Sequence, residues 1–175
     1  MYNPVSVLHS VERWTAADNP TRRDDGGLFV VLTLGTNHVY REKATGEIVD
    51  NCQKRPPNLF AEEVLTVDDC YDSLRQTVET LQKTARGMLR VIVTVSPIRY
   101  RKYGYHESAL SKATLLLAAD RLAKAYTATV DYFPAYELVN DELRDYRFYQ
   151  PDMLHPSQQA VEYIYEQFAE TYFAE

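Results

Sequence analysis

The sequence predicts a three-layer α/β/α sandwich in which helices cover both faces of a parallel sheet. Three runs are typical of strands, and they are LFVVLTLG (28–35), MLRVIVTV (88–95) and TATVDYFP (127–134). The first two are continuously apolar, which predicts buried strands, the first of them buried on both faces. Helical patterns separate these runs, and such alternation is typical of a parallel sheet with right-handed crossovers. Because about five strands are usual in this architecture, the sheet is expected to be incomplete.

The length of 175 residues fits one domain, residues 1–175, with its own core. The net charge of -6 and the pI of about 5.3 argue against nucleic-acid binding, which needs a basic face. No apolar run approaches the roughly 20 residues of a membrane span, and MYNPVSVLHS lacks the pattern of a signal peptide. Two cysteines do not make a disulfide framework, so we expect a cytoplasmic protein without a membrane partner.

The segments before and after the first predicted strand have weaker sequence patterns of secondary structure. Residues 3–13 are expected to form a short helix with Pro4 in its first turn. The polar segment 16–27 is expected to be a loop, and residues 36–64 are expected to be irregular. Long irregular excursions in compact domains are usually functional or disordered.

Four helices are predicted after this excursion, because apolar residues recur there at helical spacing. Thr66 and Asp69 are arranged as a capping box before the first of them, and Gly87 follows its end. The predicted helices span residues 67–86, 108–126, 135–145 and 157–173.

Three loops are expected to border a site, because ligands bind beyond the carboxyl ends of parallel strands. They are GTNHVY after the first strand, SPIRY after the second and the region of Pro134 after the third. The late loop YQPDMLHPSQQA adds Asp152 and His155. A carboxylate there can accept from the imidazole Nδ1–H and leave Nε2 to take a proton from a nucleophile. The same spacing also fits a loop histidine beside a helix cap.

Two further positions suggest substrate contacts. The Gly35 N–H and the Asn37 side chain are suitable donors for an oxyanion hole, although they also fit a strand end and a turn. Arg99 follows the second strand and is suited to bind an anionic substrate group with two hydrogen bonds, although it also fits a surface loop.

Other nucleophiles and a metal site are less well supported by the sequence. Ser96 precedes a proline and is more simply a turn residue, and Cys52 lies in the long excursion without a nearby base in sequence. His38 and His106 have no H-x-x-x-H spacing that would let them join the late aspartate and histidine in a metal site. We therefore expect no metal and no cofactor.

Several segments together resemble the GSCFA domain family of the SGNH (GDSL-like) hydrolases, whose sheet is flavodoxin-like. They are LTLGTNHVY, TGEIVDNCQKRP, VTVSPIRY, SKATLLLA, YFPAYELVNDELRDYRFY and DMLHPS. The resemblance implies ester hydrolysis, for example of O-acyl groups on glycans. It implies that His155 is the general base, that Asp152 orients it, and that Gly35 and Asn37 correspond to a Gly-x-Asn block.

The sequence departs from this family at its start. The Gly-Ser-Cys-Phe-Ala motif that supplies the nucleophilic serine is absent, and MYNPVSVLHS resembles the segment that follows it. We therefore expect a domain that lacks its first strand, with an exposed apolar sheet edge that promotes self-association. The competing interpretation is a catalytically silent binding or interaction module on the same fold.

Overall fold

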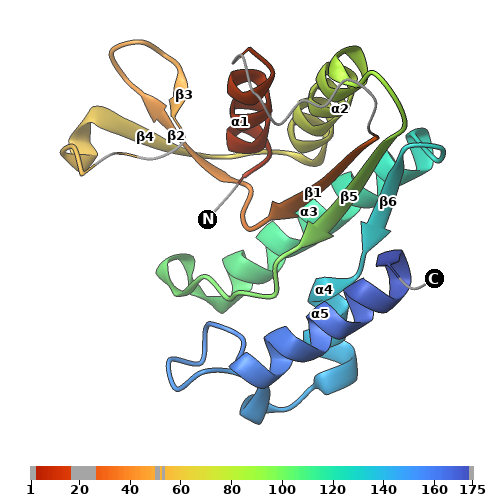
Figure 1. Ribbon diagram of the computed structural model, residues 1–175. Helices are drawn as coiled ribbons and strands as arrows, with labels where there is room; N and C mark the ends of the chain where they lie inside the picture. Colours follow the sequence, from red (N-terminus) through yellow and green to blue (C-terminus); the bar gives the residue numbers. More distant parts are fainter. Residues whose placement is uncertain (1–2, 17–26, 50–51, 53, 174–175) are drawn as a thin grey trace.

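A parallel sheet forms the middle layer of the computed structural model, which describes residues 3–16, 27–49, 52 and 54–173 (Figure 1). Its strands are β1 (Leu28–Leu34), β5 (Leu89–Val95) and β6 (Val130–Phe133) in the order β1-β5-β6. Both pairings are parallel, with Val30 opposite Val91 and Val93 opposite Tyr132. The three predicted strands and the α/β class are confirmed, but β1 is not buried on both faces as expected, because Phe29 is 39% and Val31 45% exposed.

The central strand β5 is buried on both faces, as its continuous apolar sequence predicts. Val91, Val93 and Val95 belong to the main core, while Ile92 belongs to a smaller core on the opposite face. This alternation follows from the period of two in a strand, which turns successive side chains to opposite faces.

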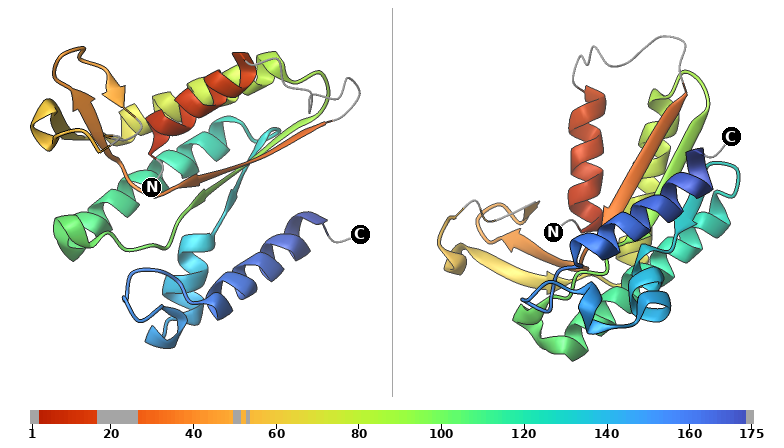
Figure 2. Two further views of the ribbon diagram at one scale, coloured as in Figure 1. Left: turned by 60° about the vertical axis from the view of Figure 1, so that its left-hand side comes forward. Right: turned by 60° about the horizontal axis from the view of Figure 1, so that its bottom comes forward.

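Helices cover both faces of this sheet. On one face lie α1 (Pro4–Ala16), α2 (Val67–Thr84) and α3 (Gly104–Ala125), and on the other lies α5 (Gln158–Phe173) (Figure 2). The rings of Phe168 and Tyr172 in α5 pack edge-on against Phe133 and Phe29 of the sheet. The predicted three-layer arrangement is therefore present.

The start of α2 confirms the predicted capping box. The Thr66 hydroxyl accepts a hydrogen bond from the Asp69 N–H at 3.2 Å, and the Asp69 carboxylate accepts from the Thr66 N–H at 2.9 Å. The start of α3 lies at Gly104, four residues before the predicted position. Gly104 has a φ of 81°, which a glycine adopts without strain.

The prediction that residues 36–64 are irregular is wrong. This segment forms an antiparallel sheet in the order β3-β2-β4, with β2 (His38–Glu42), β3 (Ile48–Val49) and β4 (Phe60–Val64). Strand β2 is held to β4 by its ladder and by the Arg41 guanidinium, which binds both oxygens of the Glu63 carboxylate. The strands are short and carry charged residues, so their sequence signal is weak.

The segment after β6 is shorter and more irregular than the predicted helix 135–145. A single turn, α4 (Ala135–Glu137), continues into a π-helical turn, Leu138–Leu143, which ends at Arg144 with a φ of 53°. The chain then passes through a 3-10 turn, Tyr146–Phe148, into the loop that carries Asp152 and His155. In the part of the chain described, no helix is long and apolar enough to cross a membrane.

Candidate functional site

The loop that carries Asp152 and His155 is closed at its base by main-chain hydrogen bonds. Tyr149 and Pro156 form an antiparallel bridge, and the Gln150 N–H donates to the His155 carbonyl at 2.8 Å. The Ser157 N–H donates to the Phe148 carbonyl at 2.7 Å, just before α5 begins. The loop therefore has a fixed conformation on the start of a helix.

Asp152 holds this loop and the histidine ring at the same time. Its Oδ1 accepts from the N–H groups of Leu154 at 2.9 Å and His155 at 3.1 Å, while its Oδ2 lies 2.5 Å from His155 Nδ1. The two main-chain donors, and then the ring, lower the pKa of the Asp152 carboxyl to about 2. An ionised carboxylate at Nδ1 favours the tautomer in which Nε2 is unprotonated and able to accept a proton.

The His155 side chain is open to solvent on its other side. It is 51% exposed, and its ring has a hydrogen bond with Asp152 alone in the part of the chain that the structure describes. A general base needs an accessible nitrogen, and this geometry provides one.

Arg99 joins the exit of β5 to the histidine loop, as its place after the second strand suggests. Its main-chain N–H donates to the Leu154 carbonyl at 3.1 Å. Its guanidinium lies 4.3 Å from the centre of the Tyr149 ring and 5.7 Å from that of Tyr146. The structure therefore brings Arg99 and the Asp152–His155 loop together.

Lys112 joins the exits of β1 and β5. Its Nζ donates to the Gly35 carbonyl and to the Ser96 carbonyl, each at 2.6 Å. The residue is 3% exposed, and burial lowers the pKa of its amine to about 8. Lys112 was not among the residues predicted from the sequence. The available signal was its position on the buried stripe of α3, three residues before Leu115.

Gly35 and Asn37 lie directly after β1, but their polar groups are partly engaged elsewhere. Asn37 is 2% exposed, its amide Nδ2 donates to the Leu65 carbonyl at 2.7 Å, and its main-chain N–H donates to the Ser111 hydroxyl at 3.1 Å. That the Gly35 N–H and the Asn37 side chain bind an oxyanion therefore stays a prediction. In the described ranges no hydrogen bond links His155 to either residue.

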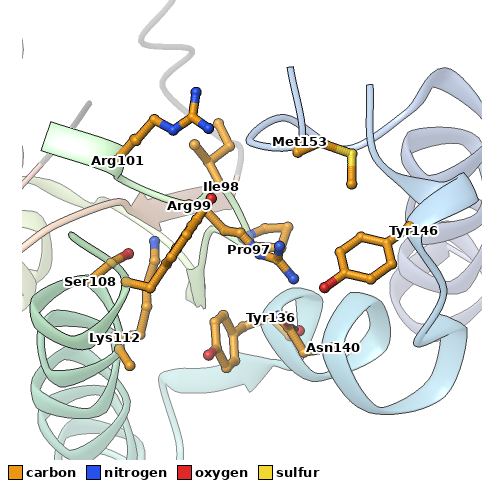
Figure 3. Close-up of a pocket in the computed structure, with 12 residues that line it drawn as sticks. Pro97, Ile98, Arg99, Arg101, Ser108, Lys112, Tyr136, Asn140, Tyr146 and Met153 are labelled. Carbon is orange, nitrogen blue, oxygen red and sulfur yellow. Dashed lines mark hydrogen bonds between the residues drawn. The ribbon is translucent and has the colours of Figure 1, made fainter. Parts of the chain in front are cut away.

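A pocket of about 510 Å³ opens between the β5 exit loop, the start of α3 and the segment after β6 (Figure 3). Arg99 and Lys112 line it, and so does Met153 from the histidine loop. Figure 3 shows the Arg99 guanidinium directed toward Tyr146 within this space. The volume lies in the range of roughly 300–1,000 Å³ found for small-molecule sites.

The other nucleophile and metal candidates have ordinary structural surroundings. The Ser96 hydroxyl accepts from the Ile98 N–H at 3.3 Å, as expected for a turn, and Cys52 is a half-buried free thiol. His38 is stacked on Tyr103 with ring centres 3.7 Å apart. Among the residues described, no three histidine, cysteine or acidic side chains are grouped as a metal site requires.

Comparison with known proteins gives one match. A family model described as "GSCFA family" matches residues 12–168, which is most of the chain. No curated protein and no solved structure matches the chain.

Proposed function

The chain belongs to the GSCFA family, and from this premise we propose that it is an SGNH-type hydrolase domain that cleaves carboxylic esters, such as O-acyl groups on glycans. The observation that carries the proposal is the contact of 2.5 Å between Asp152 and His155 on a loop that Asp152 itself fixes. This is the geometry of an acid-oriented general base.

In the proposed reaction a serine Oγ attacks the ester carbonyl carbon while His155 Nε2 takes the serine proton. The tetrahedral oxyanion then collapses, the C–O bond of the alcohol breaks, and the imidazolium returns its proton to the leaving oxygen. Water hydrolyses the acyl-enzyme by the same steps, with His155 again as base. Asp152 stabilises the imidazolium in both halves, and we assign the oxyanion to the Gly35 N–H and the Asn37 amide.

The nucleophile in this proposal is the serine of a Gly-Ser-Cys-Phe-Ala motif that is not among the 175 residues. Support comes from the sheet, because β1 pairs with β5 and has no second strand partner within the described chain. A further parallel strand placed there would end near Gly35 and Lys112. We propose that a segment outside this sequence supplies both the strand and the serine.

A catalytically silent module remains the second proposal, and one observation favours it. No serine hydroxyl in the described part of the chain has a hydrogen bond with His155. Without a nucleophile the chain alone retains at most the residual catalysis of a mutated triad, on the order of 10³–10⁴ over the uncatalysed reaction.

A serine-directed fluorophosphonate probe separates the two proposals. The gene product, with any residues encoded before Met1, is labelled and the modified residue is located by mass spectrometry. The hydrolase proposal expects one labelled serine in a Gly-Ser-Cys-Phe-Ala motif and loss of labelling in His155→Ala. Equal labelling in His155→Ala contradicts the role of His155, and an absence of labelling supports the silent module.

A further inference from the structure

The pocket beside the histidine loop has an unusual charge. Arg99, Arg101 and Lys112 line it, and none of its twelve lining residues is acidic. The whole chain carries a net charge of -6. A pocket that gathers three cations in an acidic protein has a locally positive potential, which attracts anions.

The two arginines of the pocket differ from most others in the described ranges. Six arginines form ion pairs with carboxylates, and these are Arg41, Arg55, Arg75, Arg90, Arg121 and Arg147. Neither Arg99 nor Arg101 has a carboxylate partner among the described residues. Their guanidinium groups are therefore available to a ligand.

Packing holds the Arg99 guanidinium in place without using its hydrogen bonds. The guanidinium lies 4.3 Å from the centre of the Tyr149 ring. The main-chain N–H of Arg99 donates a hydrogen bond to the Leu154 carbonyl. A guanidinium stacked in this way keeps its planar edge for a carboxylate or phosphate, which it binds with two parallel hydrogen bonds. The half-buried position also weakens screening by salt.

Further features of the pocket suit a negatively charged sugar. The first two turns of α3 contribute Tyr105 and Ser108, and the main-chain N–H groups of this helix end, which also carries Glu107, favour negative charge. Tyr136 and Tyr146 supply aromatic faces, and Asn140, whose amide donates to the Tyr136 carbonyl and accepts from the Tyr149 hydroxyl, adds a fixed polar group to the wall. Aromatic walls with a few convergent polar groups are typical of small-molecule sites.

We propose, building on the hydrolase function above, that this pocket binds the anionic group of an acidic acylated sugar and so selects negatively charged esters. The shared chemistry is a carboxylate or phosphate held by Arg99, with Arg101 at the rim and the buried Lys112 at the wall. Met153 of the histidine loop lines the same space, so a sugar bound there lies next to the Asp152–His155 pair.

Isothermal titration calorimetry of the 175-residue chain tests this at low and moderate salt with D-glucuronate, D-glucose 6-phosphate and D-glucose. We expect one or both anionic sugars to bind, glucose to give no measurable binding, and added salt to weaken the interaction. The two anions show whether the pocket prefers a carboxylate or a phosphate. Glucose binding as tightly as the anions, or no binding by any of the three at millimolar concentrations, overturns the proposal.

Substitutions identify the pocket as the place of binding. Arg99→Gln is expected to weaken anion binding roughly tenfold or more, and Arg99→Lys to lose part of it because the planar fork is gone. Arg121→Gln removes the same charge from the other end of α3, where Arg121 pairs with Asp68, and is the matched control. Circular dichroism checks that each variant is folded. If Arg99→Gln does not fold, Arg101→Gln serves as the second pocket variant. Equal affinities in the pocket and control variants overturn the assignment.

This binding needs neither a nucleophile nor His155, so its failure is separable from that of the hydrolase function. If His155→Ala still binds the anion and ester cleavage does not need His155, the proposed reaction is refuted and the anion pocket is supported. His155-dependent cleavage without anion binding refutes the pocket alone.

Discussion

Asp152 and His155 are joined by two hydrogen bonds over a span of four residues. The carboxylate accepts from the His155 main-chain N–H at 3.1 Å and lies 2.5 Å from the ring Nδ1, while its Oδ1 also accepts from the Leu154 N–H. One side chain therefore sets both the loop conformation and the orientation of the ring. A residue with this double role ties the folding of the loop to its chemistry.

The pH dependence of this loop follows from the Asp152 carboxyl. Its pKa in the folded state is lowered to about 2, first by the two main-chain N–H groups and then by the ring. Its contribution to the free energy of unfolding is therefore present above its usual pKa of about 3.9 and is lost as the pH falls through 2. Carbon-detected NMR titration of the Asp152 carboxyl checks this. A midpoint near 4 would show that the contacts do not form in solution.

Replacing the His155 ring separates these two causes. In His155→Phe the main-chain donors stay and the ring contact is lost. We expect the Asp152 titration to move upward but to remain below its usual range, because the main-chain hydrogen bonds are the larger cause. A return to about 4 would assign the whole shift to the ring.

Lys112→Met tests the link between the ends of β1 and β5. The substitution leaves two carbonyls, those of Gly35 and Ser96, without their donor, and each unpaired buried polar group costs about 1–3 kcal/mol, or about 2–6 kcal/mol for both. Relief of the desolvated charge offsets part of this, so we expect a net loss of about 1–3 kcal/mol in urea unfolding at pH 7. Lys124→Met, on the exposed face of the same helix, is the control and should change little.

Comparing the natural protein with Lys112→Met at different pH values measures the titration of the buried Lys112 amine. The Lys112 pKa is about 8 in the folded state against about 10.5 in the unfolded chain, so between these values only the unfolded state binds the proton. The free energy of unfolding of the natural protein should therefore rise relative to Lys112→Met as the pH goes from 8 to 10.5. The full change is on the order of 2–3 kcal/mol. A constant difference across this range would argue against the buried, desolvated amine.

His38 gives an expectation at acidic pH. Burial lowers its pKa below 6.5, and this outweighs the attraction of the Glu62 carboxylate 3.8 Å away. Its contribution to stability is thus present above pH 6.5 and is lost as the pH falls through the lowered pKa. His38→Phe, which keeps a ring against Tyr103, should flatten the fall in melting temperature between neutral and mildly acid pH. His106→Phe, at an exposed position, should leave that fall unchanged.

Strand β1 is an edge strand of the sheet within the described residues, which suggests self-association. Val31 is 45% exposed on this strand, and exposed apolar edges pair with other chains. We expect sedimentation to show concentration-dependent association that Val31→Lys reduces. Leu117→Lys, at an exposed apolar position on α3, is the control for a general gain in solubility. Equal effects of the two variants would remove the edge from the explanation.

Strong local patterns made much of the fold predictable from the sequence. The apolar runs of β1, β5 and β6 predict three strands, and the Thr66–Asp69 pair marks the start of α2, but the expected burial of β1 on both faces is wrong. The Asp152 and His155 pair was also predictable, because a separation of three residues lets both side chains meet within one loop.

The missed features depend on contacts between distant segments. In the small sheet β3-β2-β4, strands β2 and β4 pair across a separation of about twenty residues. Short strands with charged residues give too weak a sequence pattern to predict this pairing. Lys112 looks like a surface residue in sequence, and its role appears only when the carbonyls of Gly35 and Ser96 converge on it. The cations of the pocket likewise come from separate segments.

Ester cleavage by the gene product, with any residues encoded before Met1, tests the central claim about His155 most directly. The value of kcat/KM for 4-nitrophenyl acetate is compared between the natural protein, His155→Ala and the control His106→Ala. A positioned general base contributes about 10²–10⁴ in rate, so His155→Ala should lose at least about a hundredfold while His106→Ala stays unchanged. Full activity in His155→Ala would contradict the account.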